Sequence, residues 1–84
     1  MENNKFTLEL LDFEREDSIY TKRYGNNVLV IEPLTFSRFY FYATRNDLPL
    51  VRKTMCENLD DALREANNWY IKFKIEMAQN REIN

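Results

Sequence analysis

The residues best able to do chemistry in this sequence are tyrosines that alternate with cationic side chains in its middle third. Tyr40 and Tyr42 lie two positions apart, with Arg38 just before them, while Lys22 and Arg52 fall in neighbouring predicted strands. Aromatic rings stack on nucleobases and cations neutralise phosphates, so this pattern suits nucleic acid. Tyrosine and arginine also suit protein hot spots, because they give large contact area and directional hydrogen bonds. Both interpretations stay open, and the net charge of −2 favours a protein partner.

Two further tyrosines could extend this set. Tyr20 and Tyr24 flank Lys22 at two-residue spacing. Strand alternation alone does not decide whether these rings point to the same side as Tyr40 and Tyr42. A structural interpretation also stands beside the functional one, because half-buried rings commonly cover the outer face of a two-layer sheet.

Several kinds of catalytic and metal site are excluded by the composition. The chain has no His, one Cys (Cys56) and one Gly (Gly25). It therefore lacks the ligand sets of ordinary zinc sites, the base of a Ser-His-Asp or Cys-His nucleophile, and a glycine-rich phosphate loop. The acidic clusters at 12–17 and at Asp60–Asp61 fit helix capping and solvation. We expect no catalytic residue, no metal and no cofactor, and hence no enzyme activity.

The last third of the chain predicts the element that must position these residues. Asn58 is a good helix N-cap, and acidic residues follow it in the first helical turn. Apolar residues then recur at spacings of three and four, and no Gly or Pro interrupts residues 58–80. These features predict an amphipathic helix of five to six turns. Its expected buried stripe consists of Leu59, Leu63, Ala66, Tyr70, Phe73 and Met77, widened by Ala62 and Trp69.

A second apolar group lies off this stripe. From an advance of ~100° per residue, Ile71, Ile75 and Ala78 lie roughly 90–170° around the predicted helix. Isolated apolar residues are common on protein surfaces, so this group need not have a function. The functional alternative is a patch that docks a partner, or a second copy of the chain in a homodimer.

The middle of the chain predicts antiparallel strands. Gly25 and two asparagines can join a strand at Ile19–Tyr24 to one at Val28–Glu32, which Pro33 closes. A strand over 38–45 follows, then a turn over 46–49 and a strand at Leu50–Met55 that leads into the helix. Residues 5–16 fit either a strand or a helix, and Thr7 with the polar run after it favours a strand followed by a turn.

Together these elements predict an α+β fold in one domain, residues 1–84. It is an antiparallel meander of three to five strands with one long C-terminal amphipathic helix packed on one face. Because strand side chains alternate, Phe39, Phe41 and Ala43 should face the helix. Tyr40 and Tyr42 should then point away from it, together with Thr44.

The distribution of charge and the hydropathy of the chain indicate its kind of partner and its cellular compartment. Residues 1–17 carry two cations against six acids, whereas residues 18–55 carry six cations against two acids. A bipolar molecule of this kind can offer one charged face to a partner, or pair its opposite charges internally. No apolar run reaches the length of a signal peptide or membrane span, and the single Cys suits a reducing compartment. We expect a cytoplasmic protein with no membrane partner.

The segment from Thr54 to Trp69, which reads TMCENLDDALREANNW, resembles a recurring ending in which a strand leads into a closing helix. Small phage-encoded proteins that bind and inhibit host machinery, such as anti-CRISPR and RNA-polymerase-binding inhibitors, are similar in size and in this ending. The resemblance implies a host protein or protein complex as partner. The residue pattern, and not the resemblance, supplies the candidate contacts, which are the tyrosine and arginine face or Ile71 and Ile75. The chain is also similar to three-stranded-sheet-plus-helix DNA-binding domains, which makes a DNA- or RNA-binding module the alternative.

Overall fold

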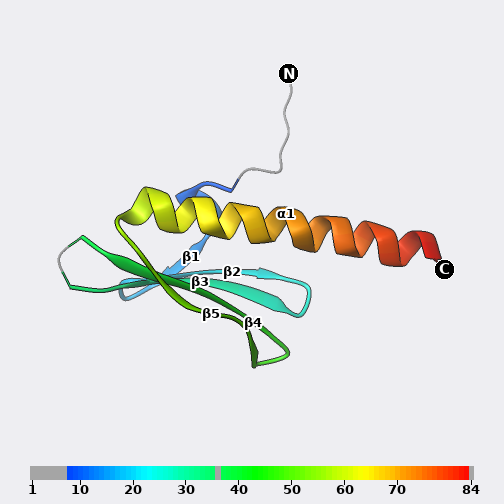
Figure 1. Cartoon of the computed structure of the whole chain (residues 1–84), viewed down its shortest axis with the longest axis horizontal. Helices are drawn as coiled ribbons and strands as arrows, with labels where there is room; N and C mark the ends of the chain where they lie inside the picture. The colour runs from blue at the N-terminus through cyan, green and yellow to red at the C-terminus, as the bar shows by residue number, and fades with distance from the viewer. Residues whose placement is uncertain (1–7, 36, 84) are drawn as a thin grey trace, which may run out of the picture.

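The computed structural model describes residues 8–35 and 37–83 and has two layers, a sheet and a helix (Figure 1). The sheet has five antiparallel strands in the order β1-β2-β3-β4-β5, so each strand pairs with its neighbour in the sequence. This is the predicted α+β meander with one long C-terminal helix. The elements in chain order are a 3-10 turn at Leu10–Asp12, β1 (Glu14–Glu16), β2 (Ile19–Tyr24), β3 (Asn27–Pro33), β4 (Phe39–Arg45), β5 (Leu48–Cys56) and α1 (Leu59–Ile83).

Helix α1 begins where the capping residues predict. The backbone N–H of Asp61 donates to the Asn58 side-chain oxygen at 2.9 Å, which satisfies one of the free donors of the first turn. Asp60 and Asp61 also place negative charge at the positive end of the helix dipole. Arg64 then bonds the Asp61 carboxylate at 2.9 Å, one turn further on.

Tight turns set the register of the sheet. Gly25 lies at φ +62°, and together with Asn26 it forms a two-residue turn that pairs Tyr24 with Asn27. Asn46 and Asp47 adopt positive φ of 53° and 68° and connect β4 to β5 in the same way. The expected turn over 46–49 is therefore shorter. Leu48 and Pro49 belong to β5, an edge strand that tolerates a missing backbone donor.

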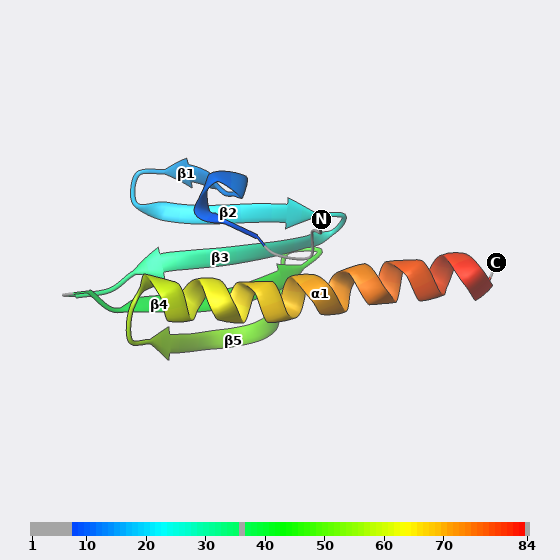
Figure 2. The ribbon, with the colours of Figure 1, turned by 90° about the horizontal axis from the view of Figure 1, so that it is seen from above.

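The core lies between the helix and the inner face of the sheet. Phe41, Leu29 and Ile31 are fully buried in the two central strands, as is Ala43 next to Phe41. Helix α1 covers β3, β4 and β5 (Figure 2), and small residues on its underside let the helix approach the sheet closely. The alternation predicted for β4 is confirmed, because Phe41 and Ala43 are buried while Tyr40 and Tyr42 are half-exposed.

The segment before β1 covers the part of the sheet that α1 leaves free. Leu8 and Phe13 are buried in the core, and the short turn between them lies on the helix side of the sheet (Figure 2). The Asn67 side chain accepts from the Leu8 backbone N–H and donates to the Leu8 carbonyl at 3.1 Å. The sequence predicts a strand followed by a turn within residues 5–16, of which residues 5–7 lie outside the described part of the chain. In the described residues the order is reversed, because a 3-10 turn at Leu10–Asp12 precedes the short strand Glu14–Glu16.

The C-terminal part of α1 projects beyond the sheet (Figures 1 and 2). Among the helix side chains described, which extend to residue 79, Phe73 is the last that is buried, and Met77, one turn further on, is 45% exposed. The prediction that Met77 belongs to the buried stripe is wrong, because no strand lies beneath this turn of the helix. The projection also makes the molecule elongated, with a radius of gyration of 13.3 Å against the ~12 Å of a compact chain of this length.

Candidate protein-interaction surface

The face of the sheet opposite α1 carries the tyrosines that the sequence singles out. Cross-strand pairing groups Thr21, Val30 and Tyr42 in one row on this face, and Glu32 with Tyr40 and Met55 in the next row. No element of the described chain crosses this face (Figure 1). We call it the outer face, and define it by Glu14, Glu16, Ile19, Thr21, Arg23, Val28, Val30, Glu32, Tyr40, Tyr42, Thr44, Lys53 and Met55.

The outer face has an aromatic and charged cluster over β3, β4 and β5. The Lys53 ammonium lies 5.1 Å from the centre of the Tyr42 ring and 5.5 Å from that of Tyr40. It also lies 3.5 Å from the Glu32 carboxylate. Ring faces and a carboxylate both attract a cation, so the three contacts hold one ammonium over two rings. The cluster presents two half-buried rings in a fixed arrangement, which suits a contact surface.

The same cluster changes the acidity of a phenol. Partial burial raises the pKa of Tyr42 above its ordinary value, and the negative charge of Glu32 and a hydrogen bond to its carboxylate raise it further. Folding therefore holds the Tyr42 proton more tightly than the unfolded chain does. This contribution to stability is complete below the unfolded pKa of 10.0, and it is lost as the pH rises from there through the folded pKa.

Replacement of Glu32 by glutamine should lower the pKa of Tyr42 towards 10.0, though not to it, since burial is the larger cause and remains. The measurement is a pH titration of phenolate absorbance, in which subtraction of a Tyr42→Phe titration in the same background isolates this residue. Glu14→Gln, on the outer face but away from the ring, is the matched control and should leave the titration unchanged. An unaltered Tyr42 titration in Glu32→Gln would contradict the geometry of the cluster.

Lys22 does not join the outer face. Its cross-strand partner is Leu29, a fully buried core residue, so its side chain is on the helix side of the sheet. Tyr20 and Tyr24 also lie on the helix side of the sheet. Tyr20 pairs with the buried Ile31, and Tyr24 packs edge-on against Tyr70 of α1, with 5.2 Å between the ring centres. The cause is the two-residue turn after Tyr24, which fixes which side each β2 residue faces.

The two arginines of the predicted site are placed differently. Arg38 is exposed in the loop just before β4, where its carbonyl accepts from Leu34 N–H at 2.8 Å. Arg52 is exposed in β5, within the stretch where pairing with β4 shifts register beside Tyr42. The sequence analysis does not select Lys53, because the sequence does not reveal the register shifts in β5 that place this residue beside Tyr42. The cation that contacts both rings is Lys53.

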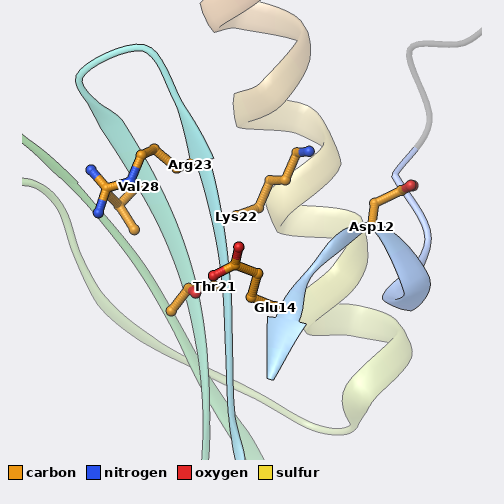
Figure 3. Close-up of a pocket in the computed structure, with 6 residues that line it drawn as sticks. All are labelled: Asp12, Glu14, Thr21, Lys22, Arg23 and Val28. Atoms are coloured by element: carbon orange, nitrogen blue, oxygen red, sulfur yellow. The ribbon is translucent and has the colours of Figure 1, made fainter. Parts of the chain in front are cut away.

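A pocket of about 200 Å³ lies at the margin of the outer face, where β1 begins beside Thr21 of β2 (Figure 3). Asp12, Glu14, Lys22 and Arg23 contribute two acidic and two basic side chains to its lining. Figure 3 shows the Lys22 ammonium directed towards α1 and the Arg23 guanidinium directed away from it. Because its charges are mixed and its cations diverge, the pocket offers no concentrated site for an anion or a metal.

The edges of the sheet are poorly suited to bind another strand. Edge strand β1 has only three residues, Glu14–Glu16. The other edge, β5, contains Pro49 and two register shifts, and it carries Arg52 and Lys53. Short edges, proline, bulges and lysine are features that prevent edge-to-edge pairing. A partner is therefore better accommodated on the outer face than along an edge.

The apolar group predicted on α1 is partly exposed. Ile71 is half-buried, and Ile75 is 49% exposed on the projecting part of the helix. Met77 joins Ile75 there, so the projecting part presents apolar atoms on more than one side. Arg45 bonds Glu76 at 3.0 Å and Asn27 at 2.7 Å, and these bonds hold the helix to the sheet where the projection starts.

Cys56 is not a reactive thiol. It is 6% exposed in the core next to the first turn of α1. Burial raises the pKa of the Cys56 thiol, and the carboxylates of Glu65 and Asp61 raise it further. The thiol stays protonated at neutral pH, and it packs as a small apolar side chain.

The described residues form neither a cluster of metal ligands nor a helix suited to cross a membrane. Within residues 8–35 and 37–83, no group of three or more Cys, Asp or Glu side chains gathers as ligands for a metal ion. In the same part of the chain, no helix has the length and apolar character that a bilayer span requires. Comparison with protein families, curated proteins and solved structures finds no match.

Proposed function

We propose that this chain is a non-enzymatic protein-interaction domain that binds a partner protein through its outer face. The observation that supports the proposal is a five-stranded sheet with one face open in the described structure. The centre of that face is apolar and aromatic, with Val28, Val30, Tyr40 and Tyr42, and its margins are charged. Protein interfaces share this arrangement of an apolar, aromatic centre within a polar rim.

The distribution of charge favours protein over nucleic acid. Binding to nucleic acid requires several unpaired cations along one surface. Lys22 lies on the other side of the sheet, and Lys53 is paired with Glu32. The exposed cations that remain, Arg23 on β2 and Arg52 on β5, lie at opposite sides of the face and do not form a continuous basic surface. Glu14 and Glu16 add negative charge to the margin of the outer face.

The biological setting is a separate proposal that rests on the resemblance to small phage-encoded inhibitors. We propose a cytoplasmic host protein as the target, which the chain inhibits or redirects. The projecting end of α1, where Ile75 and Met77 are exposed, adds a second apolar surface for such a contact. A domain with two contact surfaces can hold two proteins at once.

Capture from a bacterial lysate tests the use of the outer face. Tyr42→Ala should weaken binding of the captured protein by tens-fold, since truncation of a central tyrosine typically costs about 2 kcal/mol or more. Lys22→Ala is the matched control, because it alters a predicted residue on the opposite side of the sheet, and it should retain the partner. Equal retention by both variants, with a wild-type chain that is monomeric, would contradict the proposal. If the wild type instead captures nucleic acid and Tyr42→Ala does not, the result would support the nucleic-acid alternative.

A further inference from the structure

We infer that the protein bound on the outer face is a second copy of this chain, packed sheet against sheet in a symmetric dimer. This inference rests on the proposed function, because it names the partner of the same surface. The reason is that the outer face is complementary to itself in charge. It leaves the projecting end of α1 available to a different protein.

Opposite charges lie at the two sides of the outer face. Glu14 and Glu16 lie on edge strand β1, where both are exposed. Lys53 lies on the other edge strand, β5, and Arg52 is exposed next to it. The uncharged residues Thr21, Val30 and Tyr42 form the row that runs between them. The row through Val30 thus runs from an acid on β1 through uncharged side chains to a cation on β5, while Arg23 lies outside this row, beside Val28.

Only one orientation of a two-fold axis matches these charges. A two-fold parallel to the strands and centred on β3 lays β1 of one copy over β5 of the other. Glu14 then faces Lys53 of the second copy, and the same contact occurs twice by symmetry. Val30 lies at the axis but is only 7% exposed, so Thr21 and Tyr42, which are half-exposed in the same row, supply the central contact. A two-fold across the strands would instead set Glu14 against Glu14, where like charges repel.

The basic residue remains able to make this second contact. The Lys53 side chain is 52% exposed although it contacts Glu32 and the two tyrosine rings. An ammonium has three donors, so it can pair with one carboxylate in its own chain and another across the interface. Glu14 is exposed and bonds no cation among the described residues.

The size of the face fits a weak dimer. Five strands at about 4.8 Å spacing and about six residues of strand length give a flat footprint of roughly 24 by 20 Å. The accessible area of the side chains on a surface is larger than its flat footprint. We expect each partner to bury roughly 600–800 Å², which is near the low end for stable protein interfaces. We therefore expect dissociation in the micromolar range.

Charge reversal tests the inference by sedimentation. Glu14→Lys alone and Lys53→Glu alone each place like charges at both contacts of the dimer, so dissociation constants should rise at least tenfold. An equal mixture of the two variants restores opposite charges at both contacts of the mixed dimer. The mixture should therefore return to twice the chain mass of 10.2 kDa at concentrations where each variant alone is monomeric. Circular dichroism checks that each variant is folded, and Lys22→Glu, on the helix side, should dimerise like the wild type.

Each outcome decides between the proposals. Recovery of the dimer only in the mixture supports the inference. A wild type that is monomeric at every concentration overturns it, as do single variants that still dimerise alone. If the wild type is monomeric and Tyr42→Ala releases a captured protein, the outer face binds a different protein, and the proposed function stands. If there is neither a dimer nor a Tyr42-dependent partner, both proposals fail.

Discussion

Replacement of Phe41 by alanine is expected to remove a large part of the stability of this protein. Phe41 is fully buried on the central strand β4, between the sheet and α1. Truncation of a buried phenylalanine costs about 3–5 kcal/mol, because it removes apolar contact and leaves a cavity. A chain of 84 residues has a total stability of roughly 4–13 kcal/mol, and short domains lie towards the lower end of that range. The loss is therefore comparable to the whole stability.

The measurement is urea unfolding followed by circular dichroism. Tyr42→Ala is the matched control, since it truncates an aromatic residue next to Phe41 that points to the outer face. Because Tyr42 is half-exposed, its truncation should cost only about 1 kcal/mol. Equal losses in the two variants would mean that the two faces of β4 are equally buried, which contradicts the two-layer arrangement.

Replacement of Asn67 by alanine should cause the second-largest loss of stability. The Asn67 amide bonds the backbone N–H and carbonyl of Leu8, and it also donates to the Leu63 carbonyl at 3.0 Å. Leu8 is only 4% exposed, so water cannot readily replace these partners. Leaving buried backbone groups unsatisfied costs about 1–3 kcal/mol.

Hydrogen exchange locates this effect. In Asn67→Ala the amide of Leu8 should exchange much faster, while amides in the central strands lose only the protection that follows from lower global stability. Asn68→Ala is the control, because that neighbouring side chain is exposed. Unchanged exchange at Leu8 would show that Asn67 does not hold the segment before β1 against the helix.

The sequence predicts those parts of the fold that local chemistry determines. The Asn58 cap and the spacing of apolar residues locate the start and the buried side of α1. Alternation in the run from Phe39 to Tyr42 assigns the two faces of β4 without any knowledge of its neighbours. In each case the signal lies in consecutive residues, and the packing of the sheet and helix reinforces it.

Other parts depend on features with little sequence signal. The side on which Lys22 lies depends on whether the turn after Tyr24 has two residues or three, and the run from Gly25 to Asn27 allows both. Strand β1 has no apolar alternation because all three of its residues are exposed. The exposure of Met77 depends on where the strands end beneath the helix. Lys53 reaches the tyrosines because bulges in β5 change its register, which periodicity does not reveal.

Methyl NMR of the wild type over a range of protein concentrations tests most directly whether the outer face makes the protein contact. Strand β3 supplies both probe and control, since Val28 and Val30 lie on the outer face and Leu29 and Ile31 lie in the core. On association, the valine methyl resonances should shift with concentration while those of Leu29 and Ile31 stay nearly constant. Shifts confined to Leu29 and Ile31, or to the methyls of Ile75 and Met77 on α1, would contradict an interface on the outer face.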